Sequence, residues 1–161
     1  MSVTPAKQSP ALPLLLVFLL LAMILLVPRF VQGSVPLPPV FADSSTLDDA
    51  IEQGKQTGKP VLALVTSDAC LACTRLERDT LPDGRVTSLI ADRFIPVVIN
   101  EREAPDDARR LPYMYLPATL VIRDGVVVAR HEGYLPAEAY TAWLEHAADD
   151  APESRNASAA P

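Results

Sequence analysis

Residues 60–73 read PVLALVTSDACLAC and join an apolar run to two closely spaced cysteines. The first part of this stretch, Pro60 to Thr66, is an apolar, β-branched run typical of a buried strand. The chain's only two cysteines, Cys70 and Cys73, follow at a C-x-x-C spacing and precede a stretch with helical character. A strand that leads into this motif at the start of a helix is typical of a dithiol–disulfide redox site.

The cysteine spacing suits redox chemistry but leaves alternatives open. The two sulfur atoms are expected about one helical turn apart, within reach of a disulfide, and Cys70 would begin the helix, where unpaired N–H groups favour a thiolate. A static structural disulfide is one alternative, although it would close a short loop and constrain the unfolded chain little. A zinc site is another, but it needs four ligands, and the two histidines, His131 and His146, are not spaced as ligands.

Residues 11–27 read ALPLLLVFLLLAMILLV and form an almost purely apolar segment. The segment lies at the lower length limit, about 17 residues, for spanning a bilayer. We interpret residues 11–28 as a retained transmembrane signal anchor, with a cleaved signal peptide as the alternative. Residues 1–10 would then be cytoplasmic, and the chain would be a single-pass protein of the inner membrane with its C-terminal domain in the periplasm or outside the cell. Both cysteines would face an oxidising compartment.

Composition divides the remainder of the chain into three regions. Residues 29–43 are proline-rich and are expected to form an extended spacer. Residues 44–147 have the size of one domain. Residues 148–161 show no apolar periodicity and are expected to be a disordered tail. The net charge of −6 argues against nucleic acid as a partner.

Within residues 44–147 helices and strands are expected in alternation. Helices are expected after a cap at Ser44–Thr46 and ending at Gly54 and Gly58, over Cys70–Arg78, after Pro82–Asp83, and over Pro136–Ala147. Strands are expected over Pro60–Thr66 and over Phe94–Ile99, where Pro96 requires an edge or an irregular position. A hairpin of Ala118–Arg123 and Val126–Arg130 is expected to turn at Asp124-Gly125. Residues 100–110 are expected to be a charged loop or a weak helix.

This order of elements resembles the thioredoxin superfamily over nearly all of residues 44–147. Three motifs carry the resemblance, namely Lys59-Pro60-Val61, Cys70-Leu71-Ala72-Cys73 and Tyr115-Leu116-Pro117-Ala118-Thr119. The resemblance implies an α/β thioredoxin-like fold, with a central mixed sheet flanked by helices, behind the single N-terminal transmembrane helix. It also implies a cis peptide bond before Pro117, whereas without such context an X-Pro bond is cis in about one case in twenty.

Within the superfamily the chain most resembles membrane-anchored periplasmic members and the C-terminal domain of the disulfide reductase DsbD. The shared features are the Lys-Pro-Val strand, an apolar-Ala pair between the cysteines and an acidic residue, here Glu77, four places after the second cysteine. The resemblance implies a thiol–disulfide oxidoreductase that needs no cofactor or metal. Cys70 would attack a substrate disulfide, and Cys73 would release the substrate and leave the redox disulfide Cys70–Cys73.

The resemblance also assigns roles to residues outside the motif. Leu116 and Pro117 would hold the substrate strand. Tyr115, with Tyr113 and Met114, would either form an apolar substrate-binding lip or pack within the loop. The expected partners are protein thiols and disulfides, an upstream electron donor or acceptor, and the membrane through residues 11–27.

Glu77 lies one helical turn beyond Cys73. It would accept a proton from Cys73 or be an ordinary solvated carboxylate, and both interpretations stand.

Three departures from the thioredoxin pattern bear on the expected chemistry. The Asp that thioredoxins carry six residues before the first cysteine is Leu64, and the Trp just before that cysteine is Ala69. Asp68 adds a carboxylate that would disfavour a thiolate. The pair Leu71-Ala72 supplies no cation to stabilise one. We therefore predict a reductant or a mild exchanger, not a strong oxidant.

Two other functions stay open. The loss of the Asp and Trp features keeps alive a non-catalytic binding or assembly module with a static Cys70–Cys73 disulfide. A dithiol that carries a soft metal ion such as Cu(I) ranks lower, because no methionine or histidine cluster accompanies the cysteines. Outside the site, we expect His131 at the surface and Trp143 in the core.

Overall fold

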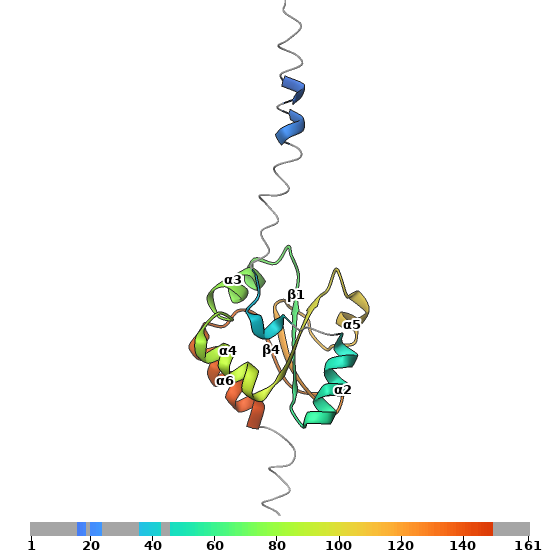
Figure 1. The fold of residues 1–161 in the computed structure, drawn as a ribbon, viewed down its shortest axis with the longest axis vertical. Helices are drawn as coiled ribbons and strands as arrows, with labels where there is room; N and C mark the ends of the chain where they lie inside the picture. Colours follow the sequence, from blue (N-terminus) through green and yellow to red (C-terminus); the bar gives the residue numbers. More distant parts are fainter. Residues whose placement is uncertain (1–15, 19, 24–35, 43–45, 150–161) are drawn as a thin grey trace, which may run out of the picture. The chain divides into compact units, whose positions relative to one another are not determined.

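The chain divides into two units, residues 1–34 and residues 35–161, in a computed structural model (Figure 1). The residues that the structure describes are 16–18, 20–23, 36–42 and 46–149. In the first unit the described residues are helical, and the rest of the expected anchor lies outside the described residues. Across the described ranges, no helix is long and apolar enough to cross a membrane. The expected cytoplasmic segment at residues 1–10 is also outside them, as are residues 150–161 of the expected tail.

The second unit is built on a four-stranded sheet with the order β2-β1-β3-β4. Its strands are β1 (Val61–Thr66), β2 (Ile95–Asn100), β3 (Ala118–Arg123) and β4 (Val126–Glu132). β1 pairs with β2 in parallel, whereas β1–β3 and β3–β4 are antiparallel, so the sheet is mixed. Pro96 lies in the edge strand β2, the first of the two expected alternatives, where its missing N–H costs no ladder bond on the open side.

Helices cover both faces of this sheet (Figure 1). One face carries α2 (Leu47–Thr57) and α5 (Pro105–Arg109), and the other carries α3 (Leu71–Asp79), α4 (Gly84–Arg93), α6 (Ala137–Asp149) and the 3-10 helix η1 (Pro39–Phe41). Because β1 is covered on both sides, all six of its residues are buried. Leu62 and Leu64 face the α3, α4 and α6 layer, while Val61, Ala63 and Val65 face the α2 layer.

Local signals explain where the elements begin and end. Thr46 caps α2 through a reciprocal pair of hydrogen bonds with Asp49, and Gly58 ends the helix in the left-handed region at φ 74°. The Asp83 carboxylate caps α4 by accepting the N–H groups of Arg85 and Val86. The predicted boundaries are therefore confirmed within one or two residues at these helix starts.

The β3–β4 hairpin turns at Asp124-Gly125, as predicted, with both residues at positive φ. Its register then shifts by one residue between Val121 and Ile122, so Val121 pairs with Ala129 and Ala118 pairs with Glu132. Directly paired residues lie on the same face of a sheet. The bulge therefore decides which residues at the end of β4 reach which face.

Some boundaries differ from those expected. The C-terminal part of the expected spacer, residues 36–42, is not a free linker: η1 forms there, Phe41 is buried, and Leu37 and Val40 pack against the core. The apolar side chains explain this, because burying them removes apolar surface from water, and Pro39 suits the first position of a helix. Gly54 lies inside α2 and does not end it, and α6 continues through Ala148, which is buried.

Candidate active site

Cys70 and Cys73 form a disulfide at the start of α3, with their Cα atoms 5.2 Å apart. Cys70 is the N-cap residue of this helix, and its Sγ accepts the backbone N–H of Cys73 at 3.1 Å. Cys73 is 1% exposed, whereas Cys70 is half-buried. Cys70 is therefore the more accessible residue of the pair, and its sulfur lies at the positive end of a helix and accepts an N–H, while Cys73 is buried.

The strand register gathers the other candidate residues at the same edge of the sheet. Thr66, at the end of β1 just before the cysteine loop, pairs with Asn100 on β2. On its other side Val65 pairs with Ala118, so Pro117 lies next to the end of β1. The Leu116–Pro117 peptide bond is cis, which confirms the prediction made from the resemblance. Pro117 is buried and its carbonyl accepts the N–H of Gly133 at 2.8 Å.

Glu77 is tied to β1 by a hydrogen bond. Thr66 Oγ1 donates to Glu77 Oε1 at 2.7 Å, and Glu77 is half-buried. Thr66 lies on the same face of β1 as Leu64, two residues on, because alternate strand residues share a face. Leu64 itself is buried among apolar side chains. The carboxylate in this region therefore comes from Glu77 on α3, paired with Thr66 at the end of β1. In the thioredoxin pattern the carboxylate comes instead from an Asp on the strand, at the position of Leu64.

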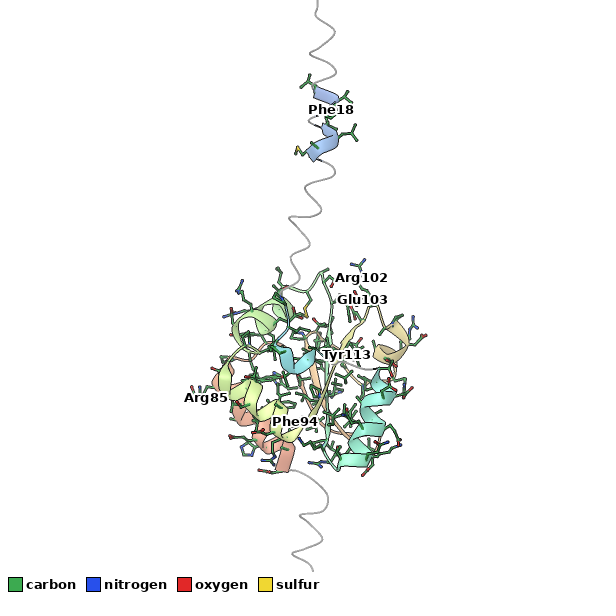
Figure 2. The ribbon with its side chains drawn as sticks, in the orientation of Figure 1. Phe18, Arg85, Phe94, Arg102, Glu103 and Tyr113 are labelled. Atoms are coloured by element: carbon green, nitrogen blue, oxygen red, sulfur yellow. A yellow bond between two sulfur atoms is a disulfide. The ribbon has the colours of Figure 1, made fainter. Side chains whose placement is uncertain are left out.

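Asp68 is also held by a hydrogen bond. Its carboxylate accepts the side-chain amide of Asn100 at 2.9 Å, which joins the cysteine loop to the end of β2. Beyond Asn100 the chain carries Arg102 and Glu103, whose side chains project outward in Figure 2. This edge of the sheet is therefore polar on the β2 side.

Three large apolar side chains of the cysteine motif and the loop before Pro117 are exposed. Leu71 is 89% exposed, Met114 77% and Tyr115 68%. Tyr113, which Figure 2 labels, packs by contrast against the α2-side core. Its hydroxyl donates to Glu101 at 3.3 Å. Burial, together with the Glu101 carboxylate, raises the pKa of Tyr113 above its ordinary value. The loop thus divides into a packed Tyr113 and an exposed Met114–Tyr115 pair.

Two residues that the sequence analysis did not single out hold this loop. The Glu132 carboxylate accepts the backbone N–H groups of Met114 at 3.2 Å and Tyr115 at 3.0 Å. Arg130 Nη1 donates to the Pro112 carbonyl at 2.6 Å, and Arg130 Nε lies 3.4 Å from Glu132 Oε1. The sequence predicts the hairpin that carries these two residues. It does not predict the bulge that brings them to this face, because the turn residues do not determine it.

His131 is half-buried, so the expectation of a surface residue is wrong. Its ring packs on Trp143 with centroids 6.0 Å apart, and within the described residues its Nε2 is buried without a hydrogen-bond partner. Burial lowers the pKa of His131, against a smaller opposite effect of Glu132. Trp143 is partly buried against the core rather than enclosed in it.

A mixed four-stranded sheet with a C-x-x-C disulfide at a helix start and a cis-proline before the hairpin defines a protein of the thioredoxin-fold class. The thioredoxin-like domain family matches residues 47–148, and the chain belongs to this family.

Comparison with individual proteins points to the same class. The thiol:disulfide interchange protein DsbD of Ralstonia nicotianae is 30% identical over 108 residues, which are 64% of this chain but 18% of that protein's length. The oxidised C-terminal domain of DsbD from Neisseria meningitidis has a TM-score of 0.52 at 24% identity, over 66% of this chain and 97% of that domain. A DsbH oxidoreductase has a TM-score of 0.58 at 16% identity, over 76% and 98% of the two chains. The structural likenesses show the fold, and the chain is a thioredoxin superfamily protein that resembles DsbD.

Proposed function

We propose that the chain is a membrane-tethered thiol–disulfide oxidoreductase that reduces or exchanges disulfides of exported proteins. The observation that carries the proposal is the asymmetry of the cysteine pair at the helix start. Cys70 is accessible and its sulfur accepts the Cys73 N–H, whereas Cys73 is enclosed. That arrangement suits one attacking and one resolving thiol.

The exchange is balanced in two displacements. In the first, the Cys70 thiolate attacks one sulfur of the substrate disulfide, the substrate S–S bond breaks, and one substrate thiolate leaves. In the second, the Cys73 thiolate attacks Cys70 Sγ, the mixed disulfide breaks, and the second substrate thiolate leaves. The substrate gains two electrons and the chain keeps the Cys70–Cys73 disulfide. A partner dithiol must then reduce this disulfide to start the next cycle.

Charges around the motif support a reductant or a mild exchanger. The nearest arginines along α3 are occupied elsewhere: the Arg75 guanidinium lies over the Tyr134 ring, 4.1 Å from its centroid, and Arg78 pairs with Asp79 at 2.8 Å. Stabilisation of a Cys70 thiolate then rests on the N–H groups at the helix start rather than on a cationic side chain. A strongly stabilised thiolate would favour the reduced protein and make it a strong oxidant.

We further propose a location and a class of partners for the chain. Residues 11–28 act as the anchor, and the domain works in the periplasm or outside the cell. The protein partners are thiols and disulfides, with an upstream donor or acceptor of electrons. The apolar segment at the N-terminus and the likeness to DsbD support these assignments.

Trapping tests the proposal directly. The pre-reduced chain is mixed with a disulfide-containing peptide, and Cys73→Ala should accumulate a mixed disulfide with the peptide, detected by non-reducing electrophoresis and mass. Cys70→Ala is the matched control and should form none under the same conditions. A wild-type chain that neither reduces the peptide nor yields an adduct on Cys73→Ala would favour the alternative function, a binding or assembly module with a static disulfide.

A further inference from the structure

The loop before Pro117 is held by side chains rather than by a strand ladder. Residues 112–117 lie in neither a helix nor a strand, yet the backbone N–H groups of Met114 and Tyr115 both point at one acceptor, the Glu132 carboxylate. The Glu132 side chain is 17% exposed, whereas the two residues that donate to it lie at the exposed surface. Hydrogen bonds to an ionised acceptor are stronger than neutral ones. These two charge-assisted hydrogen bonds therefore hold the backbone of an otherwise irregular segment.

Arg130, which lies on β4 with Glu132, also holds this loop. Residues two apart on a strand share a face, so Arg130 and Glu132 project to the same side. Arg130 donates to the Pro112 carbonyl and lies beside the Glu132 carboxylate, which orients it. The pair, which we call the β4 clamp, thus contacts the backbone of three loop residues: Pro112, Met114 and Tyr115.

The bulge in the hairpin makes the clamp possible. With the shifted register, Glu132 pairs with Ala118 and lies on the sheet face where Tyr113 and Leu116 pack. An unbroken ladder would pair Ala118 with His131 instead and turn Glu132 to the opposite face. In the observed register it is His131 that takes the opposite face, against Trp143. The bulge in the hairpin therefore places Glu132 where it can bind the backbone of the loop.

The clamp holds the backbone of an exposed part of the site. Because the backbone N–H groups of Met114 and Tyr115 are used inward, their side chains are displayed outward, 77% and 68% exposed, beside Pro117. These two neighbouring exposed apolar side chains are available for contact with a bound polypeptide. The strand register places Pro117 beside the end of β1, from which the chain continues to Cys70. A polypeptide bound at Cys70 can therefore extend over this loop, whereas a small disulfide is too short to use it.

We propose that Glu132, oriented by Arg130, is a positioning residue that holds the Met114–Tyr115 loop for polypeptide disulfides. The inference rests on the proposed thiol–disulfide exchange and adds a specificity element to it. Glu132 touches no reacting atom in this assignment, so its loss should weaken polypeptide binding while the sulfur chemistry continues.

The test compares two substrates with the pre-reduced 161-residue chain in detergent. One is a synthetic peptide with an internal disulfide flanked by leucines, and the other is hydroxyethyl disulfide. For Glu132→Ala we expect the half-saturating peptide concentration to rise about tenfold with little change in the limiting rate. The rate constant with hydroxyethyl disulfide should be unchanged. Glu132→Gln, which keeps one acceptor oxygen, should fall between, and Glu145→Gln, an exposed carboxylate on α6, is the charge-matched control.

Hydrogen exchange gives a readout that does not depend on turnover. The amides of Met114 and Tyr115 should exchange faster in Glu132→Ala than in wild type, with the β1 amides unaffected. Should Glu132→Ala fail to fold, Arg130→Ala, at a half-exposed side chain, carries the test by the same criteria.

Three outcomes overturn the inference. A folded variant with unchanged peptide saturation shows that the clamp does not position the loop for substrate. Equal losses with the peptide and with hydroxyethyl disulfide assign Glu132 to the sulfur chemistry instead. If the wild-type chain reduces neither substrate, the proposed function fails first, and the positioning role falls with it.

Discussion

At the scale of single residues, the position of Glu77 decides whether it can act as a base for Cys73. Its carboxylate is held by Thr66 one turn beyond Cys73, on the face of α3 that meets the end of β1. A carboxylate placed there can take the Cys73 proton while Cys73 attacks the mixed disulfide. The thioredoxin pattern uses an Asp at the position of Leu64 for this purpose, so Glu77 would supply the same function from the helix.

We predict that Glu77→Gln slows the resolving step at least about tenfold, because a positioned general base contributes at least that much. Thr66→Val keeps the carboxylate but removes its hydrogen bond, and should cause a smaller loss. Stopped-flow decay of the mixed disulfide, followed between pH 5 and pH 9, separates the two variants. Equal rates in wild type and Glu77→Gln at every pH would leave Glu77 as a structural carboxylate.

Tyr140 gives the fold a dependence on alkaline pH. It is fully buried, its hydroxyl lies 3.2 Å from Thr119 Oγ1, and burial raises its pKa to about 12. Because the folded pKa exceeds the ordinary value of about 10, the neutral phenol stabilises the fold below pH 10, and this stabilisation is lost as the pH rises toward 12. The loss amounts to about 2 to 3 kcal/mol.

Denaturant titrations at pH 8 and pH 11.5 test this with Tyr140→Phe. The variant should be less stable at pH 8, by about 1 kcal/mol, because Thr119 loses its partner. It should also lack the part of the alkaline loss that comes from Tyr140. An identical decline with pH in both proteins would place the alkaline sensitivity in other groups.

At the scale of elements, the starts and ends of most helices and strands were predictable because short-range chemistry determines them. Thr46, Asp83 and the Asp124-Gly125 turn each act within a few residues. The bulge between Val121 and Ile122 was not predictable, because it follows from how the whole hairpin packs. The same limit explains why Cys70, Cys73 and Pro117 could be named from sequence, while the contacts of Glu132 could not.

Gly54 shows how packing between elements overrides helix propensity. A Cβ at this position would lie 3.0 Å from the Lys59 carbonyl oxygen and 3.2 Å from Val61 Cγ2. Gly54→Ala should therefore destabilise the domain by about 1 to 3 kcal/mol through overpacking, although alanine is the better helix former. Gly84→Ala is the matched control, since nothing lies within 4 Å of its added Cβ. Thermal unfolding that ranks the two variants in the reverse order would contradict this packing.

At the scale of the whole molecule, the domain extends further toward the N-terminus than its strands and helices suggest. Phe41 is buried against the core that α4 and α6 share, and η1 contacts α4 and β2. The proline-rich composition of residues 36–42 predicted a spacer, because composition does not show that a segment has a surface to pack on. The apolar side chains between and after the prolines, Leu37, Val40 and Phe41, make this segment pack on the core.

Removal of this segment should cost stability without touching the disulfide. Phe41→Ala should lower the free energy of unfolding by about 3 to 5 kcal/mol, as for other buried phenylalanines. A chain that begins at Pro36 should unfold at a higher temperature than one that begins at Asp43. Equal melting temperatures for these two truncations would show that residues 36–42 contribute nothing to the fold.

The equilibrium reduction potential of the Cys70–Cys73 couple decides whether this disulfide takes part in exchange and in which direction it favours electron flow. The chain is equilibrated with dithiothreitol or glutathione buffers of known ratio, and the reduced fraction is measured by thiol alkylation. We predict ready exchange and a potential near the thioredoxin value of about −270 mV, since the motif has helix-start N–H groups but no cationic partner. A potential near about −120 mV would make the chain a strong oxidant. A disulfide that resists exchange for hours would contradict an exchange function altogether.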